Sequence, residues 1–162
     1  SLALLLFRLL CNIVSYMKIN NSFSATLHIL LHMEQADKPM TSEQMAAFID
    51  GNPAFIRKLL AGLRESQIVC AIKGHHGGWR LCRPASEVTL HDIYVALGEP
   101  ALFALGNRSE NPACLVEQGV NRMMSSTLAD AETLILARFK GLTLQDIGVE
   151  FMSSFNEKGH ES

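Results

Sequence analysis

Three side chains that can bind DNA, Asn52, Arg57 and Lys58, lie outside the apolar stripe of the segment 52–65. Arginine and asparagine can form hydrogen bonds with base edges in the major groove, whereas lysine more often binds phosphates. Basic residues on an exposed helix are ordinary, so taken singly they indicate only a solvated surface. Their position together near the start of one helix favours DNA binding.

A second group of such side chains lies in the segment 73–78, where Lys73, His75 and His76 accompany three glycines. A turn of this composition can approach the sugar–phosphate backbone or enter the minor groove of DNA. It is not a nucleotide-binding loop, because no buried strand leads into it and no helix follows it. The segment is interpreted as the tip of a DNA-contacting wing.

Two short helices joined by a sharp turn are predicted to position these residues. Thr41 can cap the first helix, and Gln44 three residues later completes a capping box. That helix ends at Gly51, after which Asn52 is a good N-cap and Pro53 suits the first helical position. In a helix-turn-helix the second helix lies in the major groove with its N-terminal residues at the base edges. The first turn after Asn52 is therefore the predicted reading surface.

The apolar residues in this part of the chain change from helical to strand spacing. A stripe of period 3.6 follows the second helix, and two short apolar strands flank the wing tip. Further helices are predicted over 22–33 and 90–97, so the fold class is mainly α with a small β-hairpin wing, a winged helix-turn-helix. The residues behind this prediction are Phe55, Leu59, Leu60 and Leu63 in the helix, and Ile68, Val69, Ile72, Trp79 and Leu81 in the strands.

The segment 115–140 contains no proline and repeats apolar residues at intervals of three and four. This spacing predicts one helix of about 25 residues, about 38 Å long at 1.5 Å per residue. Packing against a second copy of the chain is one role for so long a helix, because a two-fold contact can place two recognition helices one DNA turn apart. A core helix within one protomer is the alternative.

Four phrases of the chain resemble those of one bacterial family, the Rrf-type (Rrf-two) transcription regulators. They are Asn-Pro-Ala-Phe-Ile-Arg-Lys-Leu-Leu at 52–60, Lys-Gly-His-His-Gly-Gly-Trp-Arg-Leu at 73–81, the segment 88–97, and Gly-Leu-Thr-Leu-Gln-Asp at 141–146. The glycine-rich wing ending in an aromatic residue and the last phrase are the most specific. The resemblance covers about 17–151, nearly the whole chain.

This resemblance implies a homodimeric regulator, by family default a repressor, that joins its two copies through the helix 115–140. Its partner would be a double-stranded DNA operator of pseudo-palindromic sequence in the bacterial cytoplasm, and no membrane partner is expected. A winged-helix protein-interaction module that has lost DNA binding is the alternative function. The positions expected to contact DNA are Ser42, Asn52, Pro53, Ala54, Arg57, Lys58, Lys73, His75, His76 and Gly77.

The segment 99–114 corresponds to the loop in which the family keeps its sensor. Cluster-binding members resemble one another in having three cysteines there, because an iron–sulfur cluster is held by four protein ligands, mostly thiolates. In this chain only Cys114 matches, and the other two positions fall near Leu102 and Arg108. An iron–sulfur cluster is therefore not expected, nor is another cofactor.

The cysteines have more than one interpretation. Cys114 precedes the long helix, whose dipole can lower its pKa and suit it to redox sensing, but it can equally be a small apolar residue at the dimer seam. Cys70 and Cys82 lie on opposite strands of the wing and can come close. For a cytoplasmic protein, the expectation is that both are reduced packing residues. Cys11 belongs to the N-terminal extension.

The chain is expected to divide into a winged domain, a loop and an oligomerisation arm. Its apolar start is interrupted by Arg8, is too short to span a membrane and lacks a clear cleavage site. It is interpreted as upstream sequence, with an amphipathic helix as the alternative. The expected boundaries are 1–16 for this extension, 17–98 for the winged domain, 99–114 for the sensor-type loop, 115–155 for the dimerisation helix and a short C-terminal helix, and 156–162 for a flexible tail.

Charge is divided unevenly between the two halves of the chain. Residues 17–84 hold eight basic and five acidic side chains, a balance of +3, whereas residues 85–162 hold five basic and eleven acidic ones, a balance of −6. A basic field confined to one region agrees with specific DNA binding rather than a nonspecific coat on nucleic acid.

Motifs of enzymes and metal proteins are missing from the sequence. It has no phosphate-binding loop of Walker type, no Gly-x-Ser-x-Gly and no His-Glu-x-x-His, so an enzyme is not expected. His28 and His32 are four residues apart, a spacing that can chelate a metal on one helix face, but no third ligand lies nearby. They are interpreted as histidines of the surface or of a groove rim, and no metal site is predicted.

Overall fold

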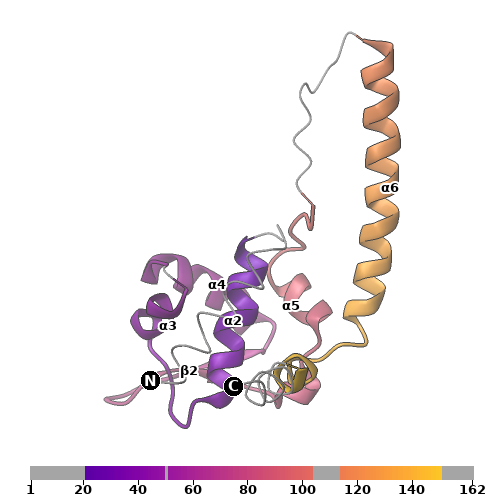
Figure 1. The fold of residues 1–162 in the computed structure, drawn as a ribbon. Helices are drawn as coiled ribbons and strands as arrows, with labels where there is room; N and C mark the ends of the chain where they lie inside the picture. Colours follow the sequence, from indigo (N-terminus) through magenta and orange to yellow (C-terminus); the bar gives the residue numbers. More distant parts are fainter. Residues whose placement is uncertain (1–20, 50, 104–113, 151–162) are drawn as a thin grey trace, which may run out of the picture.

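A helix-turn-helix, a β-hairpin and a long helix follow one another along the chain (Figure 1). The computed structural model describes residues 21–49, 51–103 and 114–150. The predicted fold class, mainly α with a small hairpin wing, is confirmed. In chain order the elements are α2 (Asn21–Gln35), α3 (Ser42–Phe48), α4 (Pro53–Glu65), β1 (Val69–Ile72), β2 (Gly78–Leu81), the 3-10 helix η1 (Ala85–Glu87), α5 (Leu90–Ala96) and α6 (Leu115–Phe139).

Side-chain caps fix where α3 and α4 begin. Thr41 Oγ1 accepts the Gln44 N–H at 3.2 Å, and the Gln44 side-chain oxygen accepts the Thr41 N–H at 2.9 Å. Asn52 Oδ1 accepts the Phe55 N–H at 2.8 Å, directly before the first helical residue of α4. Both caps satisfy backbone donors that the first helical turn leaves unpaired. The predicted starts of the two helices are confirmed.

The apolar core lies between α2, α4, α5 and the hairpin. Helix α4 contributes Leu59, Leu60 and Leu63 to this core, as predicted. It also contributes Ile56, which is fully buried. The sequence prediction placed Phe55 in this stripe instead, but Phe55 is only half-buried at the edge of the core. At the start of α4, the buried face is therefore rotated by one residue relative to the predicted face, so that Ile56 rather than Phe55 points into the core.

Helices α4 and α5 touch through their backbones at Gly62. A Cβ added to Gly62 would lie 2.5 Å from the carbonyl oxygen of Ala96, closer than real Cβ atoms come to any atom. A glycine in the middle of a helix costs roughly 1 kcal/mol relative to alanine. Glycine is needed at this position despite that cost, because any side chain would clash with α5.

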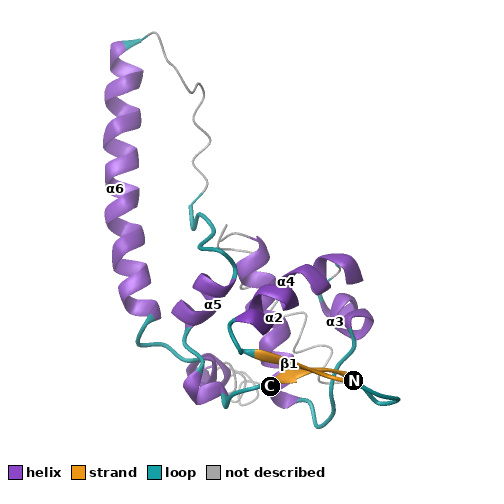
Figure 2. Cartoon of the chain, turned by 180° about the vertical axis from the view of Figure 1, so that it is seen from behind, coloured by secondary structure: helices purple, strands orange, loops and turns teal. Residues whose placement is uncertain are grey.

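Helix α6 stands away from the remainder of the described chain as an arm (Figures 1 and 2). No residue of α6 is buried. Only its C-terminal end meets the core, where the ring of Phe139 stacks on Phe23 with the ring centroids 5.4 Å apart. The predicted long helix is confirmed. The large apolar side chains that it exposes are Leu115, Val116, Val120, Met123, Met124 and Leu134.

After α6 the chain returns to the start of α5. The N–H of Leu90 donates to the carbonyl of Leu142 at 2.9 Å, and the N–H of Leu144 donates to the carbonyl of Val88 at 2.8 Å. Thr143 then caps a helix that the structure describes over 144–150, as predicted for its start. The base of the arm is therefore tied to α5 by backbone hydrogen bonds.

The wing is the antiparallel pair β1–β2, in which Val69 faces Leu81 and Ile72 faces Gly78. Strand β2 also pairs with the residue before α3, because Met40 and Trp79 exchange two backbone hydrogen bonds of 2.9 and 2.8 Å. Gly78 makes this possible, since its φ is +153° and an added Cβ would lie 2.7 Å from the Met40 carbonyl oxygen. The tip-side end of β2 is thus fixed to the segment leading into the helix-turn-helix.

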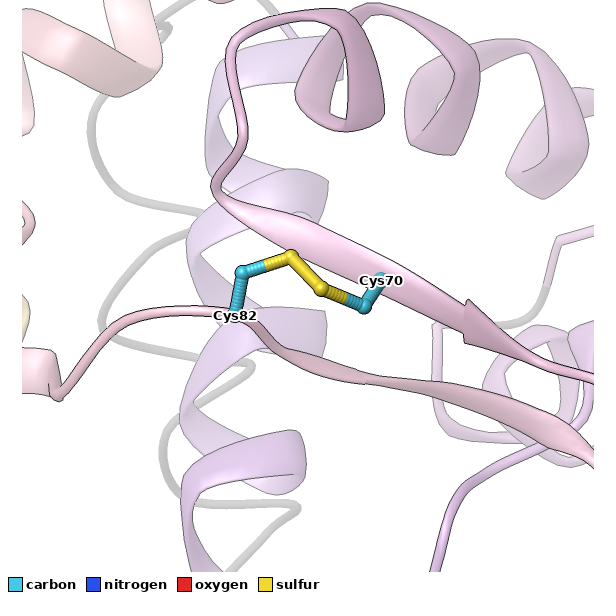
Figure 3. Close-up of a disulfide and its surroundings, with 2 residues drawn as sticks. All are labelled: Cys70 and Cys82. Carbon is cyan, nitrogen blue, oxygen red and sulfur yellow. A yellow bond between two sulfur atoms is a disulfide. The ribbon is translucent and has the colours of Figure 1, made fainter.

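Cys70 of β1 and Cys82, the residue directly after β2, form a disulfide across the wing (Figure 3). The expectation of two reduced cysteines was wrong for this structure. The strand register brings their Cα atoms to 5.3 Å, inside the range of about 4.4–6.8 Å that disulfides require. Closing a loop of this length lowers the entropy of the unfolded chain, worth about 3 kcal/mol in the loop-closure model.

Several predicted segments lie outside the described residues. They are the extension 1–16, residues 104–113 of the sensor-type loop, residues 151–155 of the last helix and the tail 156–162. The proposed division of the chain at 98 and 115 stays a prediction. Residues 101–103 of the sensor-type loop form no strand. Within the described ranges, no helix is both long and apolar enough to cross a membrane.

Candidate nucleic-acid interface

The first turn of α4 is exposed and points its polar side chains outward. Asn52, Ala54, Arg57 and Lys58 are all exposed, and Pro53 is half-buried. The side-chain oxygen of Asn52 is engaged in the cap, so a base contact by this residue would use its amide nitrogen as a donor. A capped, rigid helix start of this kind can enter the major groove.

Arg57 is held by a carboxylate of the preceding helix. Its Nη1 lies 3.3 Å from Oε1 of Glu43 in α3, and both side chains are more than half exposed. An exposed ion pair contributes at most about 1 kcal/mol, so Glu43 restrains the guanidinium without preventing another contact. Arginine can donate two hydrogen bonds to O6 and N7 of guanine, which makes Arg57 the side chain of α4 best suited to base recognition.

Lys58 and Arg64 supply further positive charge on the exposed side of α4. Neither is among the ion pairs described within the structure, and both can bind phosphates through long, flexible side chains. The four buried residues of α4 fix the opposite side of the helix to the core. One face of α4 thus serves packing and the other presents cations.

The wing tip presents a second set of exposed side chains. Lys73, His75 and His76 are exposed, and Gly77 is half-buried. The rings of the two histidines lie with their centroids 5.1 Å apart. Arg80 on β2 is also exposed, which adds a cation that the sequence prediction did not select. The alternation of β2 could have identified it, because Trp79 and Leu81 on either side pack against the core.

The wing and the helix-turn-helix share one side of the molecule. In both views α3 and the tip of the wing extend on the side opposite α6 (Figures 1 and 2). The predicted contacts of the first α4 turn and of the wing therefore belong to one end of the winged domain. The arm leaves from the other end.

Ser42 is the exception among the predicted DNA-contacting residues. Its side chain is buried, with 6% of the residue exposed, so the structure does not place it with the others. Ser42 is the first residue of α3, directly after the capping Thr41, where its side chain turns inward. Its neighbour Glu43 instead reaches α4, a contact between helices that sequence spacing alone does not reveal.

His28 and His32 pack against neighbouring rings of the domain. Both are half-buried, and the ring of His32 stacks on Phe48 with centroids 4.3 Å apart. Burial lowers the pKa of His28 to about 4, and burial together with the neighbouring His28 lowers the pKa of His32 to about 4. Among the described residues, no group of three or more metal-binding side chains exists.

Cys114 is exposed at the N-terminus of α6. Its side chain makes no capping hydrogen bond, but the backbone N–H groups of Glu117 and Val116 lower the pKa of the thiol because they favour the thiolate. A thiolate is the reactive form of cysteine. The remainder of the sensor-type loop, residues 104–113, lies outside the described part of the chain.

These features together define a class of protein. A capped second helix with an exposed cationic turn, joined to a hairpin wing, is the winged helix-turn-helix of DNA-binding transcriptional regulators. The family model named Rrf2, described as an iron-dependent transcriptional regulator, matches residues 19–150. The chain belongs to the Rrf2 family, which is a family of transcriptional regulators and not of enzymes.

Individual relatives agree with this assignment. The chain is 23% identical over 130 residues to YwnA of Bacillus subtilis, named as an HTH-type transcriptional regulator, covering 80% of this chain and 96% of the relative. A transcriptional-regulator structure from Lactobacillus plantarum has a TM-score of 0.62 at 19% identity, covering 86% and 95% of the two chains. The structure of CymR, the global cysteine regulator of B. subtilis, has a TM-score of 0.55 at 19% identity, covering 81% and 95%. The two structural likenesses show the shared fold.

The iron in the family description does not fit the cysteines of this chain. A cluster needs about four protein ligands, mostly thiolates. Of the four cysteines in the sequence, Cys70 and Cys82 are bonded to each other, Cys11 lies outside the described residues, and Cys114 stands alone beside α6. Residues 104–113 contain no cysteine. The absence of a cluster nevertheless stays a prediction.

Proposed function

We propose that the protein is a homodimeric repressor that binds a pseudo-palindromic DNA operator through the start of α4 and the wing. The observation that carries this proposal is the first turn of α4, which is capped and exposed. Arg57 and Lys58 are solvent-exposed there and lie outside the buried face of the helix. Family membership supports the DNA-binding part of the proposal. A protein with this task acts in the bacterial cytoplasm, where the chromosome lies.

In this function Arg57 reads a base and Glu43 orients it. The carboxylate 3.3 Å from Nη1 limits the rotamers of the long arginine side chain before DNA is bound. A side chain that is already ordered loses less conformational freedom on binding. Lys58, Arg64 and Lys73 bind phosphates, which position the protein but do not read sequence.

The dimer forms through α6. Its exposed apolar side chains Val116, Val120 and Met123 fall on one face, and a two-fold contact would bury the same face on both copies. Two winged domains held in this way would present two recognition helices to successive major grooves. The operator would then contain two related half-sites about one helical turn apart.

Cys114 is the proposed redox sensor of this regulator within the sensor-type loop. Its pKa is lowered by two backbone N–H groups, and it is exposed to oxidants. In protein whose Cys70–Cys82 bond is already formed, replacing Cys114 with serine should abolish the change in operator binding that peroxide or nitric oxide causes. An identical response in the serine variant would remove Cys114 from this role.

DNA binding is tested by two single variants and one matched control. A duplex selected by the full-length protein from a random-sequence pool supplies the ligand. Arg57→Ala should weaken DNA binding by about 1–3 kcal/mol and relax the sequence preference at one base pair. Lys58→Ala should weaken binding to all duplexes equally and reduce the slope of log K against log salt concentration by about one. Arg122→Ala, an exposed arginine on α6, is the control with the same loss of charge.

The outcome decides between the two functions. Unchanged binding by Arg57→Ala and Lys58→Ala would show that α4 does not enter the groove. No selectable duplex at any salt concentration would favour a protein-interaction module, for which the apolar face of α6 would be the docking surface.

A further inference from the structure

The disulfide Cys70–Cys82 lies in the wing, the smallest element of the proposed interface (Figure 3). It joins residues that are 12 positions apart, and the enclosed segment contains the whole wing tip with Lys73, His75 and His76. The loop that this bond closes therefore carries side chains proposed to contact DNA.

The bond lies on the face of the hairpin that is turned away from the core. Val69, Trp79 and Leu81 occupy one face of the strand pair and belong to the core or pack against it. The alternation of strands places Cys70, Arg80 and Cys82 on the opposite face. Cys82 is exposed and Cys70 is half-buried. The bond is thus closer to solvent than a disulfide within the core would be.

The wing has few other constraints. Each strand has four residues, and a two-stranded hairpin alone is at best marginally stable in water. The outward half of the hairpin is held by the strand pairing and by the backbone pair of Met40 with Trp79. Cutting the bond would release the wing tip from a closed loop and increase the number of conformations open to it.

The environment of the bond favours exchange with thiols. In the strand register Arg80 is the direct partner of Cys70, so a cationic side chain leaves the same face of the hairpin as the disulfide. A nearby cation favours the thiolate, which is the form that attacks disulfides and the form that leaves. In compartments that keep thiols reduced, the disulfides that do form are usually transient and redox-active.

We propose that Cys70–Cys82 is a thiol–disulfide exchange site for low-molecular-weight thiols, and that its oxidation state sets the affinity of the wing for DNA. The regulatory part rests on the proposed function. The oxidised form holds the wing tip in place and binds DNA more tightly, whereas the reduced form must order the tip on binding.

The exchange balances without any further reactant. A thiolate RS⁻ attacks the exposed sulfur of Cys82, which forms the mixed disulfide Cys82–S–S–R and releases Cys70 as a thiolate. A second RS⁻ attacks the R-bearing sulfur, which forms RSSR and releases Cys82 as a thiolate. The two electrons pass from the small thiols to the protein, and oxidation by RSSR is the same sequence in reverse.

The test uses full-length protein with Cys11→Ser and Cys114→Ser, so that Cys70 and Cys82 are the two cysteines left of four. The protein is equilibrated in buffers of reduced and oxidised glutathione, and free thiols are alkylated and counted by mass spectrometry. Binding of a pool-selected duplex is measured in the same buffers. We expect a reversible change between no label and two labels, with about tenfold tighter binding on the oxidised side.

A variant that also carries Cys70→Ser and Cys82→Ser is the matched control. It should bind the duplex as the reduced form does, in every buffer. Equal affinity on both sides of the labelling transition, or tighter binding by the reduced form, would overturn the proposed regulation. Labels that do not change with the glutathione ratio would overturn the exchange site itself.

The failure of the proposed function has a different signature. If no duplex is bound in either redox state, the DNA-binding function fails and the regulation with it, while the labelling transition still decides whether the exchange site exists. If wild-type protein responds to glutathione but the Cys11→Ser/Cys114→Ser protein does not, the response belongs to another cysteine and the wing assignment is overturned.

Discussion

Helices α4 and α6 carry similar apolar spacing but bury it in different ways. Four residues of α4 are buried within its own chain, whereas no residue of α6 is buried. Periodicity therefore predicts a helix and its apolar face in both cases, but it does not say which molecule covers that face. The apolar face of α4 is satisfied within one protomer, and the proposed dimer would satisfy that of α6.

The largest loss of stability should come from truncating a side chain on the buried face of α4. Leu60→Ala removes a fully buried leucine of α4 and should lower the free energy of unfolding by about 2–5 kcal/mol, because it leaves a cavity. Leu134→Ala, on an exposed part of α6, is the matched control. In a monomer it should change stability by less than about 0.5 kcal/mol. Urea denaturation at low protein concentration measures the free energy of unfolding of both variants. Equal losses of stability would show that α4 and α6 do not differ in burial.

Charges on the exposed face of α6 should break association but not folding. Val120→Glu together with Met123→Glu would place carboxylates in the proposed apolar contact of both copies, which should cost the dimer at least about 2 kcal/mol. Analytical ultracentrifugation should show monomers, with an unchanged circular dichroism spectrum.

The control for this pair is Ser125→Glu with Ala129→Glu. These residues are exposed on the other side of α6, so the variant has the same added charge outside the proposed contact. It should remain dimeric. Dimers of equal stability in both variants would show that another surface joins the copies.

Acidification should destabilise the winged domain, whose helix α2 contains His28 and His32. His28 and His32, whose pKa is lowered to about 4 by burial, bind protons more readily when unfolded, where the pKa is near 6.5. Their contribution is complete above pH 6.5 and is lost as the pH falls towards 4, because protonation then favours the unfolded chain.

The melting temperature measured from pH 7 to pH 5 checks this sign. It should fall in the wild type and fall less steeply in a variant with His28→Gln and His32→Gln. An equal slope in the variant would mean that these rings remain solvated enough to be protonated in the folded protein.

The smallest effect should come from the helix caps. Asn52→Ala removes the side-chain bond at the start of α4 and should lower stability by about 1 kcal/mol. Cys114→Ala, at the corresponding position of α6, removes no capping bond and should leave stability nearly unchanged. Thermal melts of both variants compare the two helix starts directly.

Local rules account for what the sequence predicted correctly. The caps at Thr41 and Asn52, the proline that starts α4 and the glycine-rich wing depend on neighbours within a few residues, so their spacing was sufficient. The length of α6 followed from the lack of proline over 115–139 and from apolar residues at intervals of three and four.

Contacts between elements account for what it missed. The disulfide is a different case, because the closeness of the two cysteines was predicted and only the expected cytoplasmic location argued for reduced thiols. The pair Arg57–Glu43 depends on the angle between α3 and α4. The burial of Ser42 and Ile56 depends on a small rotation of each helix. None of these is fixed by spacing along one segment.

The contact at Gly62 has a mechanical consequence. Because no side chain separates α4 from the Ala96 carbonyl, there is nothing soft between the two helices to take up a displacement. The hydrogen bonds of Leu90 and Leu142 couple α5 to the base of α6 in the same stiff manner. We therefore expect a tilt at the base of α6 to reach α4 through α5 rather than to be absorbed between the helices.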